Sequence, residues 1–131
     1  MCRQNDKMII YISGPITGMK NGNTRAFKHM ERVLRYSFSH MPYLKIINPV
    51  DLGERVDAYF TDVSKILREK IKPVWEDYMR VCIAELVNCT HIIFLPGYEK
   101  SRGCETELYI AERLGLAIFY TVEDMRRRYA V

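Results

Sequence analysis

Glu107 stands on the stripe of a predicted helix where an apolar side chain is expected. The stretch IFLPGYEKSRGCETELYIAERLG begins like the end of a buried strand and continues as a helix over residues 102–114. At about 100° per residue, Ile110 and Ala111 lie within about 60° of the direction of Glu107, so this carboxylate faces the sheet. A buried carboxylate needs a hydrogen-bonding partner, and a glutamate so placed often works beside a ligand. The alternative is a partly exposed glutamate at the edge of the helix.

A second candidate feature is the loop SGPITG, which joins the first predicted strand to the first predicted helix. It combines two glycines with two hydroxyl side chains, and its backbone N–H groups could hold an anion such as phosphate. The spacing matches neither GxGxxG nor a Walker A loop, so the loop is either a phosphate or sugar site or only a tight turn. Its candidate binding residues are Ser13, Gly14, Pro15, Thr17 and Gly18.

The loop PGYEKSRG, directly before the helix of Glu107, offers another anion site. Ser101 is the predicted N-cap of that helix, and a cap alone stabilises a protein by about 1 kcal/mol. The same helix start could instead hold a phosphate through Ser101 and the free N–H groups near Gly103, with Arg102 as the counter-charge. Both interpretations stay open from the residues alone.

Strands and helices must alternate along the chain to position these residues. Continuous apolar runs predict four strands that are buried on both faces, over residues 7–13, 44–48, 91–95 and 116–120. Apolar residues at helical spacing predict helices between them: one begins at Asn23 or Thr24 and stops at Pro42, one carries Pro73 in its first turn, and one spans 102–114. The polar segment 50–72 is predicted to be a partly helical surface excursion.

This alternation predicts an α/β fold with a small, doubly wound parallel sheet and helices on both faces. Ligands of such folds bind outside the carboxyl ends of the strands. Function is therefore expected in the loops after residues 13, 48, 95 and 120. Tyr11, near the carboxyl end of the first strand, is the expected hydrogen-bond partner of Glu107.

Length and composition indicate one ordinary globular domain over residues 1–131, with residues 1–6 expected to be flexible. The 48% hydrophobic and 27% charged residues are typical of soluble proteins, and no segment approaches the roughly 18 apolar residues of a membrane span. The start lacks the features of a signal peptide. We therefore expect a cytoplasmic protein without a membrane partner.

Cysteines and basic residues suggest no further site. Cysteines at positions 2, 82, 89 and 104 form no CxxC pair, so we expect reduced thiols and no metal site. The net charge of +4 is modest, and its clearest cluster is Arg126–Arg128. Such a run is usually a solvated helix face, so nucleic acid is not the favoured partner.

Several of these stretches together resemble the nucleoside 2-deoxyribosyltransferase superfamily: IYISGPITG, then NP, then WEDYMR, then CTHIIFLPGYEKSRGCETELYIAERLG. They resemble more closely a small branch often found in phage and prophage genomes, with a YISGP start and an LPGWExSxG motif. The resemblance covers about residues 8–120 and implies a flavodoxin-like fold. It also implies that a glutamate attacks the anomeric carbon of a 2-deoxyribosyl group and releases the base. The nucleophile falls on Glu107, and the tyrosine that hydrogen-bonds it falls on Tyr11.

The resemblance also bears on the substrate. Base-transferring members carry an aspartate six residues before the nucleophile, whereas the branch that hydrolyses nucleotides carries a serine that contacts the 5′-phosphate. This chain has Ser101 there, so a deoxynucleoside 5′-monophosphate is the favoured substrate, and no cofactor is implied. The aspartate that protonates or orients the leaving base is replaced by Cys82, and an acidic residue at the third strand by Thr90. Asp77 is the nearest acidic residue that could take over the role at Cys82, but on a helix its side chain points about 140° away from that of Cys82.

Three hypotheses follow. The first is an N-glycosidase or deoxyribosyltransferase of nucleosides or nucleotides, assembled as a homo-oligomer like many relatives. The second is a catalytically impaired protein that senses or sequesters a nucleotide or an ADP-ribose-like ligand. The third is a protein-interaction domain on the same fold.

Overall fold

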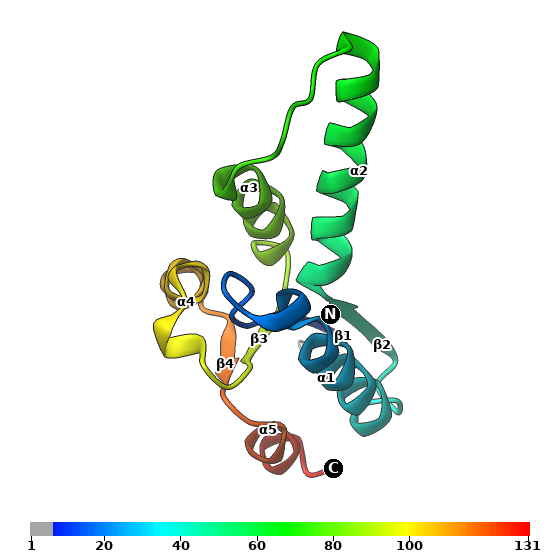
Figure 1. Cartoon of the computed structure of the whole chain (residues 1–131). Helices are drawn as coiled ribbons and strands as arrows, with labels where there is room; N and C mark the ends of the chain where they lie inside the picture. Colours follow the sequence, from blue (N-terminus) through cyan, green and yellow to red (C-terminus); the bar gives the residue numbers. More distant parts are fainter. Residues whose placement is uncertain (1–6) are drawn as a thin grey trace.

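Four parallel strands form the centre of the protein, shown by a computed structural model that describes residues 7–131 (Figure 1). The strands are β1 (Lys7–Ser13), β2 (Tyr43–Ile47), β3 (His91–Phe94) and β4 (Ala117–Phe119). Each lies within one residue of a predicted apolar run at either end. The expected flexibility of residues 1–6 concerns a segment outside the described residues.

The strand order is β2-β1-β3-β4, so β1 has a neighbour on each side. The chain first adds β2 on one side of β1 and then crosses to add β3 on the other, where Ser13 is the register partner of Phe94. The order reverses between β1 and β3, and a doubly wound sheet binds ligands at the carboxyl ends of such strands. The predicted α/β fold is confirmed, and its order matches the start of the flavodoxin-like arrangement.

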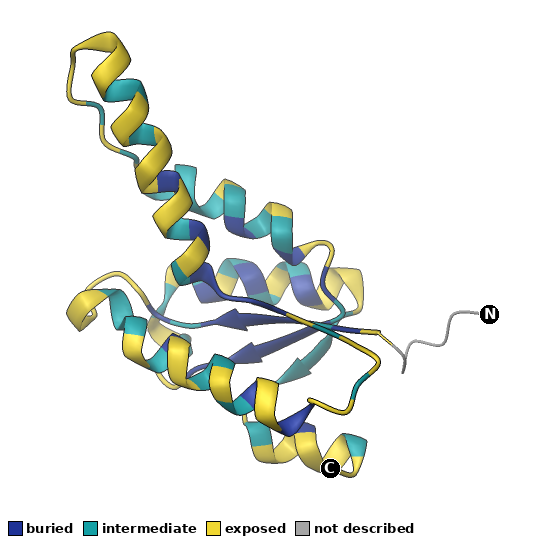
Figure 2. Ribbon diagram, turned by 90° about the vertical axis from the view of Figure 1, so that its right-hand side faces the viewer, coloured by how far each residue is buried: buried dark blue, intermediate teal, exposed yellow. Residues whose placement is uncertain are grey.

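Helices cover both faces of this sheet. They are η2 (Lys20–Asn23), α1 (Thr24–Ser37), α2 (Pro49–Leu67), α3 (Trp75–Leu86), η3 (Tyr98–Lys100), α4 (Arg102–Leu114) and α5 (Val122–Tyr129). One core joins α1 and α5 to the face that carries Ile10 and Ile12. The other joins α2, α3 and α4 to the face that carries Tyr11, Ile92 and Phe94. The two central strands, β1 and β3, are accordingly the most buried part of the sheet (Figure 2). The prediction that all four strands are buried on both faces is wrong for β2 and β4, because these strands lie at the edges of the sheet and are only partly buried.

Two predicted helix ends are wrong. The first helix ends at Ser37 rather than near Pro42, because the chain turns after it with Met41 N–H donating to the carbonyl of Phe38. The third helix begins at Trp75, after Pro73 rather than around it. At the end of α1 the apolar spacing does not change, because buried residues such as Phe38 continue past the helix end.

The prediction of a partly helical surface excursion over residues 50–72 is confirmed, and its helical part is one continuous helix, α2, that ends at Leu67. Asn48 caps it by accepting a hydrogen bond from Val50 N–H, and Pro49 occupies the first turn, where proline is favoured. Leu52 is buried in the core, but the distal half of α2 projects from the body (Figures 1 and 2). We call α2 and the return segment to α3, residues 49–74, the arm.

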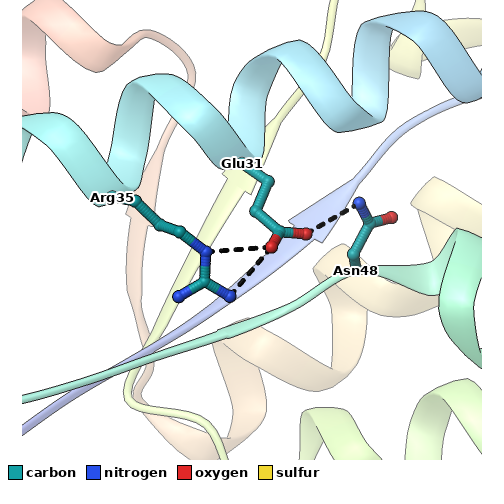
Figure 3. A network of polar contacts seen from close by, with 3 residues as sticks. All are labelled: Glu31, Arg35 and Asn48. Atoms are coloured by element: carbon teal, nitrogen blue, oxygen red, sulfur yellow. Dashed lines mark hydrogen bonds and ion pairs between the residues drawn. The ribbon is translucent and has the colours of Figure 1, made fainter.

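A polar network joins the end of β2, where the arm begins, to α1 (Figure 3). Asn48, buried at the end of β2, donates from its side-chain amide to Glu31 of α1 at 3.1 Å. Arg35 donates to the other carboxylate oxygen of Glu31 at 2.8 and 3.0 Å. The network ties the first turn of α2 to α1.

The C-terminal helix confirms the prediction for the arginine run, since Arg126–Arg128 are exposed on α5. Within residues 7–131, no helix has the length and apolar character that crossing a membrane requires. Cys82, Cys89 and Cys104 are free thiols, and Cys2 lies outside the described residues.

Candidate active site

Glu107 is a buried carboxylate in the second turn of α4, with 5% of its surface exposed. The helix begins where predicted, because Ser101 Oγ accepts a hydrogen bond from Cys104 N–H at 3.2 Å. From that start the helical period puts Cys104, Glu107 and Ala111 on the buried face. The predicted orientation toward the sheet is confirmed, and the alternative of a glutamate at an exposed helix edge is excluded.

Two hydroxyl groups of β1 hold this carboxylate. Tyr11 donates a hydrogen bond to Oε2 of Glu107, and Ser13 donates one to Oε1 at 2.7 Å. The predicted pairing of Tyr11 with Glu107 is confirmed. The contact from Ser13 was missed: we expected this residue in a phosphate or sugar loop, but its side chain is fully buried against Glu107. The signal was present in the sequence, because alternate residues of a strand share a face.

Burial and hydrogen bonding act in opposite directions on the Glu107 carboxyl group. Burial raises the pKa of Glu107 to about 7, although the hydrogen bonds from Tyr11 and Ser13 lower it. The pKa of Tyr11 is raised well above its usual value by burial and by the Glu107 charge. The phenol therefore keeps its proton, while Glu107 changes its ionisation near neutral pH.

The loops after β1 and β3 lie against each other at the carboxyl ends of the strands. A Cβ added to Gly14 would lie 2.6 Å from Leu95 Cδ1 and 2.9 Å from Leu95 Cβ. One added to Gly97 would lie 3.4 Å from Pro15 Cγ, and Gly97 also has a φ of +88°. The glycines permit this approach, so the structure brings the two predicted loops together beside Glu107.

The loop after β1 continues as a tight turn. Met19 N–H donates to the carbonyl of Ile16 at 3.1 Å, and Gly18 has the positive φ of +79° that suits the third position of a type II turn. Thr17 and Gly18 are exposed at its tip, whereas Pro15 is buried. The loop therefore contains a tight turn, and its phosphate or sugar role stays a prediction.

Residues at the start of α4 cap the helix and pack against α3. Ser101 is the predicted N-cap, and Gly103 lies close to α3, since a Cβ there would be 3.5 Å from Met79 Sδ. The Arg102 guanidinium lies over the ring of Trp75, 4.0 Å from its centroid. This contact between Arg102 and Trp75 was not predicted from the sequence. A stacked guanidinium keeps its N–H edges available for an anion.

The position of the expected acid carries a buried thiol. Cys82 belongs to the same core cluster as Tyr11, and burial raises the pKa of its thiol to about 11. Asp77 does not replace it, because its carboxylate accepts from Val74 N–H at 2.8 Å at the helix start. Thr90 has a structural role at the start of β3, away from the carboxyl ends of the strands. There its Oγ1 accepts a hydrogen bond from Ile9 N–H and donates one to the carbonyl of Ile9. Within residues 7–131, no three potential metal ligands form a cluster.

A family model described as a domain of unknown function (DUF4406) matches residues 8–120. The chain belongs to this family. No curated protein and no solved structure matches it. The matched region runs from β1 to just past β4 and includes Tyr11, Ser13, Cys82 and Glu107. The family description names no activity.

Proposed function

We propose that the protein cleaves or transfers the N-glycosidic bond of 2′-deoxynucleosides, preferentially of their 5′-monophosphates, with Glu107 as the nucleophile. One observation carries this proposal: a buried carboxylate accepts hydrogen bonds from Tyr11 and Ser13 beside the point where the strand order reverses. The resemblance to nucleoside 2-deoxyribosyltransferases supports the choice of substrate.

The reaction takes place in two displacements. A carboxylate oxygen of Glu107 bonds to C1′ of the sugar, and the electrons of the C1′–N bond leave with the base, which takes up a proton. Water or a second base then attacks C1′, gives up one proton and releases the Glu107 carboxylate, which balances the proton taken up by the leaving base. Tyr11 and Ser13 act as positioning donors, because each holds one carboxylate oxygen.

A 5′-phosphate would bind at the start of α4. Helix N-termini present unpaired N–H groups and a partial positive charge, which together favour phosphate. Ser101 and Arg102 stand at this terminus, and the loop from Gly14 to Gly18 lies on the same edge of the sheet. This arrangement supports a monophosphate over a free nucleoside.

The direct test is to incubate the protein with each deoxynucleoside 5′-monophosphate, with the matching nucleosides and with ribonucleotides. Free base is then measured by chromatography, with Glu107→Ala as the control for contaminating activity. We expect base release from at least one deoxynucleotide. If concentrated protein releases base from none of them, the proposal is wrong.

The pH profile should report the ionisation of Glu107. Only the carboxylate is a nucleophile, so kcat/KM should rise with pH through about 7 and then level off. Tyr11→Phe removes a donor that favours the charged form. We expect its profile to shift to higher pH, with a plateau about 10- to 100-fold lower, the range for a lost hydrogen bond to a charged group. An unshifted profile would show that Tyr11 does not tune Glu107.

A second candidate function is nucleotide binding without chemistry, directed at a nucleotide or an ADP-ribose-like ligand. Cys82 favours it, because a thiol with a pKa of about 11 is a poor acid for protonating a leaving base. A pure binder should raise its melting temperature with the ligand equally in the wild type and in Glu107→Ala. It should release no base in either form.

Cys82→Asp separates a weakened enzyme from a pure binder. Burial should keep the new carboxyl group protonated, so it can donate a proton to the leaving base. We expect base release to rise about 100-fold, the lower end of what general acid catalysis contributes. Cys82→Asn is the matched control, since the asparagine amide has nearly the shape of the aspartic acid carboxyl group but is no acid. Equal rates in both variants would contradict an acid role at this position.

A further inference from the structure

The two helices on one face of the sheet, α1 and α5, carry an excess of positive charge. Together they hold seven basic and three acidic side chains, a formal net charge of +4. The three helices on the other face, α2, α3 and α4, hold five basic and ten acidic side chains, a formal net charge of −5. The return segment of the arm adds +2 to that second face, which stays acidic. The sheet therefore separates a basic side of the protein from an acidic side (Figure 1).

The exposed face of α1 is basic along most of its length. Arg25, Lys28 and Arg32 are exposed, and at about 100° per residue they lie within about 60° of one another. They extend over about 10 Å of the helix axis. Within residues 7–131, none of the three forms an ion pair, and Glu31, the acidic residue of α1, is already bonded in the network at the end of β2 (Figure 3). The helix therefore presents a stripe of three cations without a carboxylate partner in the described chain.

The helix α5 lies beside α1. The Tyr129 ring of α5 packs edge to face on Phe38, the residue that directly follows α1, with 6.2 Å between the ring centroids. The last turn of α5 adds the exposed Arg126–Arg128, of which Arg127 pairs with Asp124 of the same helix at 3.1 Å. Folding thus brings together cations from the two ends of the described chain. We call the exposed surfaces of α1 and α5 the basic face.

A surface of this kind fits a polyanion. Duplex DNA carries one negative charge per about 1.7 Å of its axis, so a stripe about 10 Å long faces several phosphates at once. Lysine and arginine side chains neutralise these phosphates, and the release of counterions drives the association. We propose that the basic face binds duplex DNA through its phosphate backbone. This binding is independent of the activity proposed for Glu107, which lies on the other face of the sheet.

An anionic membrane fits the basic face less well than DNA does. A helix that lies in a membrane interface needs an exposed apolar face. The apolar side chains of α1, such as Phe27 and Leu34, are instead fully buried against the sheet. Within α1 and α5, both described in full, Tyr36 is the one large apolar side chain that is exposed. Phosphate contacts need no apolar insertion, so the surface suits a nucleic acid backbone.

Fluorescence anisotropy with a labelled duplex DNA of about 20 base pairs tests the proposal. We expect wild-type binding that weakens about 40- to 150-fold between 50 and 200 mM salt, the range for three or four phosphate contacts. Lys28→Gln with Arg32→Gln removes two contacts. At 50 mM salt its dissociation constant should be at least about tenfold higher, and the slope of log K against log salt should be smaller by about 2. Circular dichroism checks that the variant keeps its helices.

Arg55→Gln with Lys65→Gln is the matched control. It removes one arginine and one lysine from exposed positions of α2, on the acidic side, and so makes the same change in net charge. Its dissociation constant should stay within about threefold of the wild type, because screening by salt limits the reach of distant charges to about 10 Å.

Three results would overturn the proposal. Equal losses in the two double variants would mean that net charge, rather than the basic face, attracts DNA. Absence of binding by the wild type at 50 mM salt and about 100 μM protein, the weak limit of non-specific DNA binding, would exclude the surface as a DNA site. Binding to phosphatidylserine vesicles without binding to the duplex would identify a membrane as the partner.

Discussion

Glu107→Gln is expected to lower the rate of base release by about a thousandfold or more. The amide has the shape of the carboxyl group but cannot form the glycosyl intermediate, and loss of a nucleophile commonly has effects of this size or larger. Tyr11 and Ser13 should stay in place around the substituted side chain. Base release from deoxynucleoside monophosphates, measured with the wild type at the same concentration, checks this expectation.

The same substitution should stabilise the fold at high pH. Burial raises the pKa of Glu107 from 4.5 to about 7, so between these values the folded protein keeps a proton that the unfolded chain loses. The wild type therefore loses stability as pH rises from about 4.5 to 7, and the full cost of the buried charge is present above 7. At about 1.4 kcal/mol per pKa unit, Glu107→Gln should raise the free energy of unfolding by about 3 kcal/mol at pH 8.

Urea unfolding at pH 5 and pH 8 measures this difference. We expect little change at pH 5, where the folded protein already holds the proton. Glu112→Gln, on the exposed side of the same helix, is the matched control and should change stability little at either pH. If Glu107→Gln is no more stable than the wild type at pH 8, then burying the Glu107 carboxylate does not cost the free energy that its raised pKa implies.

Gly14→Ala is expected to lower the free energy of unfolding by about 1–3 kcal/mol, the usual range for overpacking a core. The added Cβ would lie 2.9 Å from Leu95 Cβ, an atom that cannot move without the backbone after β3. The two loops beside Glu107 would have to separate, so base release should fall as well. Thermal and urea unfolding measure the first effect, and the chromatographic assay the second.

Gly103→Ala is the control for this substitution. It places the same methyl group in the first turn of α4, where the nearest atom, Met79 Sδ, is at 3.5 Å, an ordinary contact distance. Alanine also has a higher helix propensity than glycine, so stability should stay level or increase slightly. Equal losses in both variants would show that the approach of Gly14 to Leu95 is not what makes glycine necessary.

Patterns along the chain predicted the elements of the site well. The 3.6-residue period was enough to turn Glu107 toward the sheet, and Ser101 marked the start of its helix. Apolar runs located the four strands, which implied that Tyr11 stands near the ligand-binding edge. These features depend on local spacing, which the sequence contains in full.

The extent of α2 was harder to predict. Its first turns carry buried residues such as Leu52, and apolar residues continue at helical spacing as far as Ile66, although the large ones near the end are exposed. The helical period was therefore present in the sequence, and the length of the helix was underestimated. A surface excursion was predicted for this segment. Only the structure revealed that it projects as an arm that exposes Tyr59 and Ile66.

By itself, the sequence determined which face of α4 carries Glu107 and that Tyr11 lies near the carboxyl end of β1, and hence their expected pairing. Tertiary structure alone decided which elements meet and at what distance. It showed that Ser13, expected as a ligand-binding residue of the loop, donates a hydrogen bond to Glu107. It also showed that the Arg102 guanidinium lies over the ring of Trp75, and that Cys82 and Tyr11 belong to one core cluster. The physical reason is that periodicity defines the face of an element, whereas contacts between faces depend on how distant segments pack around one sheet.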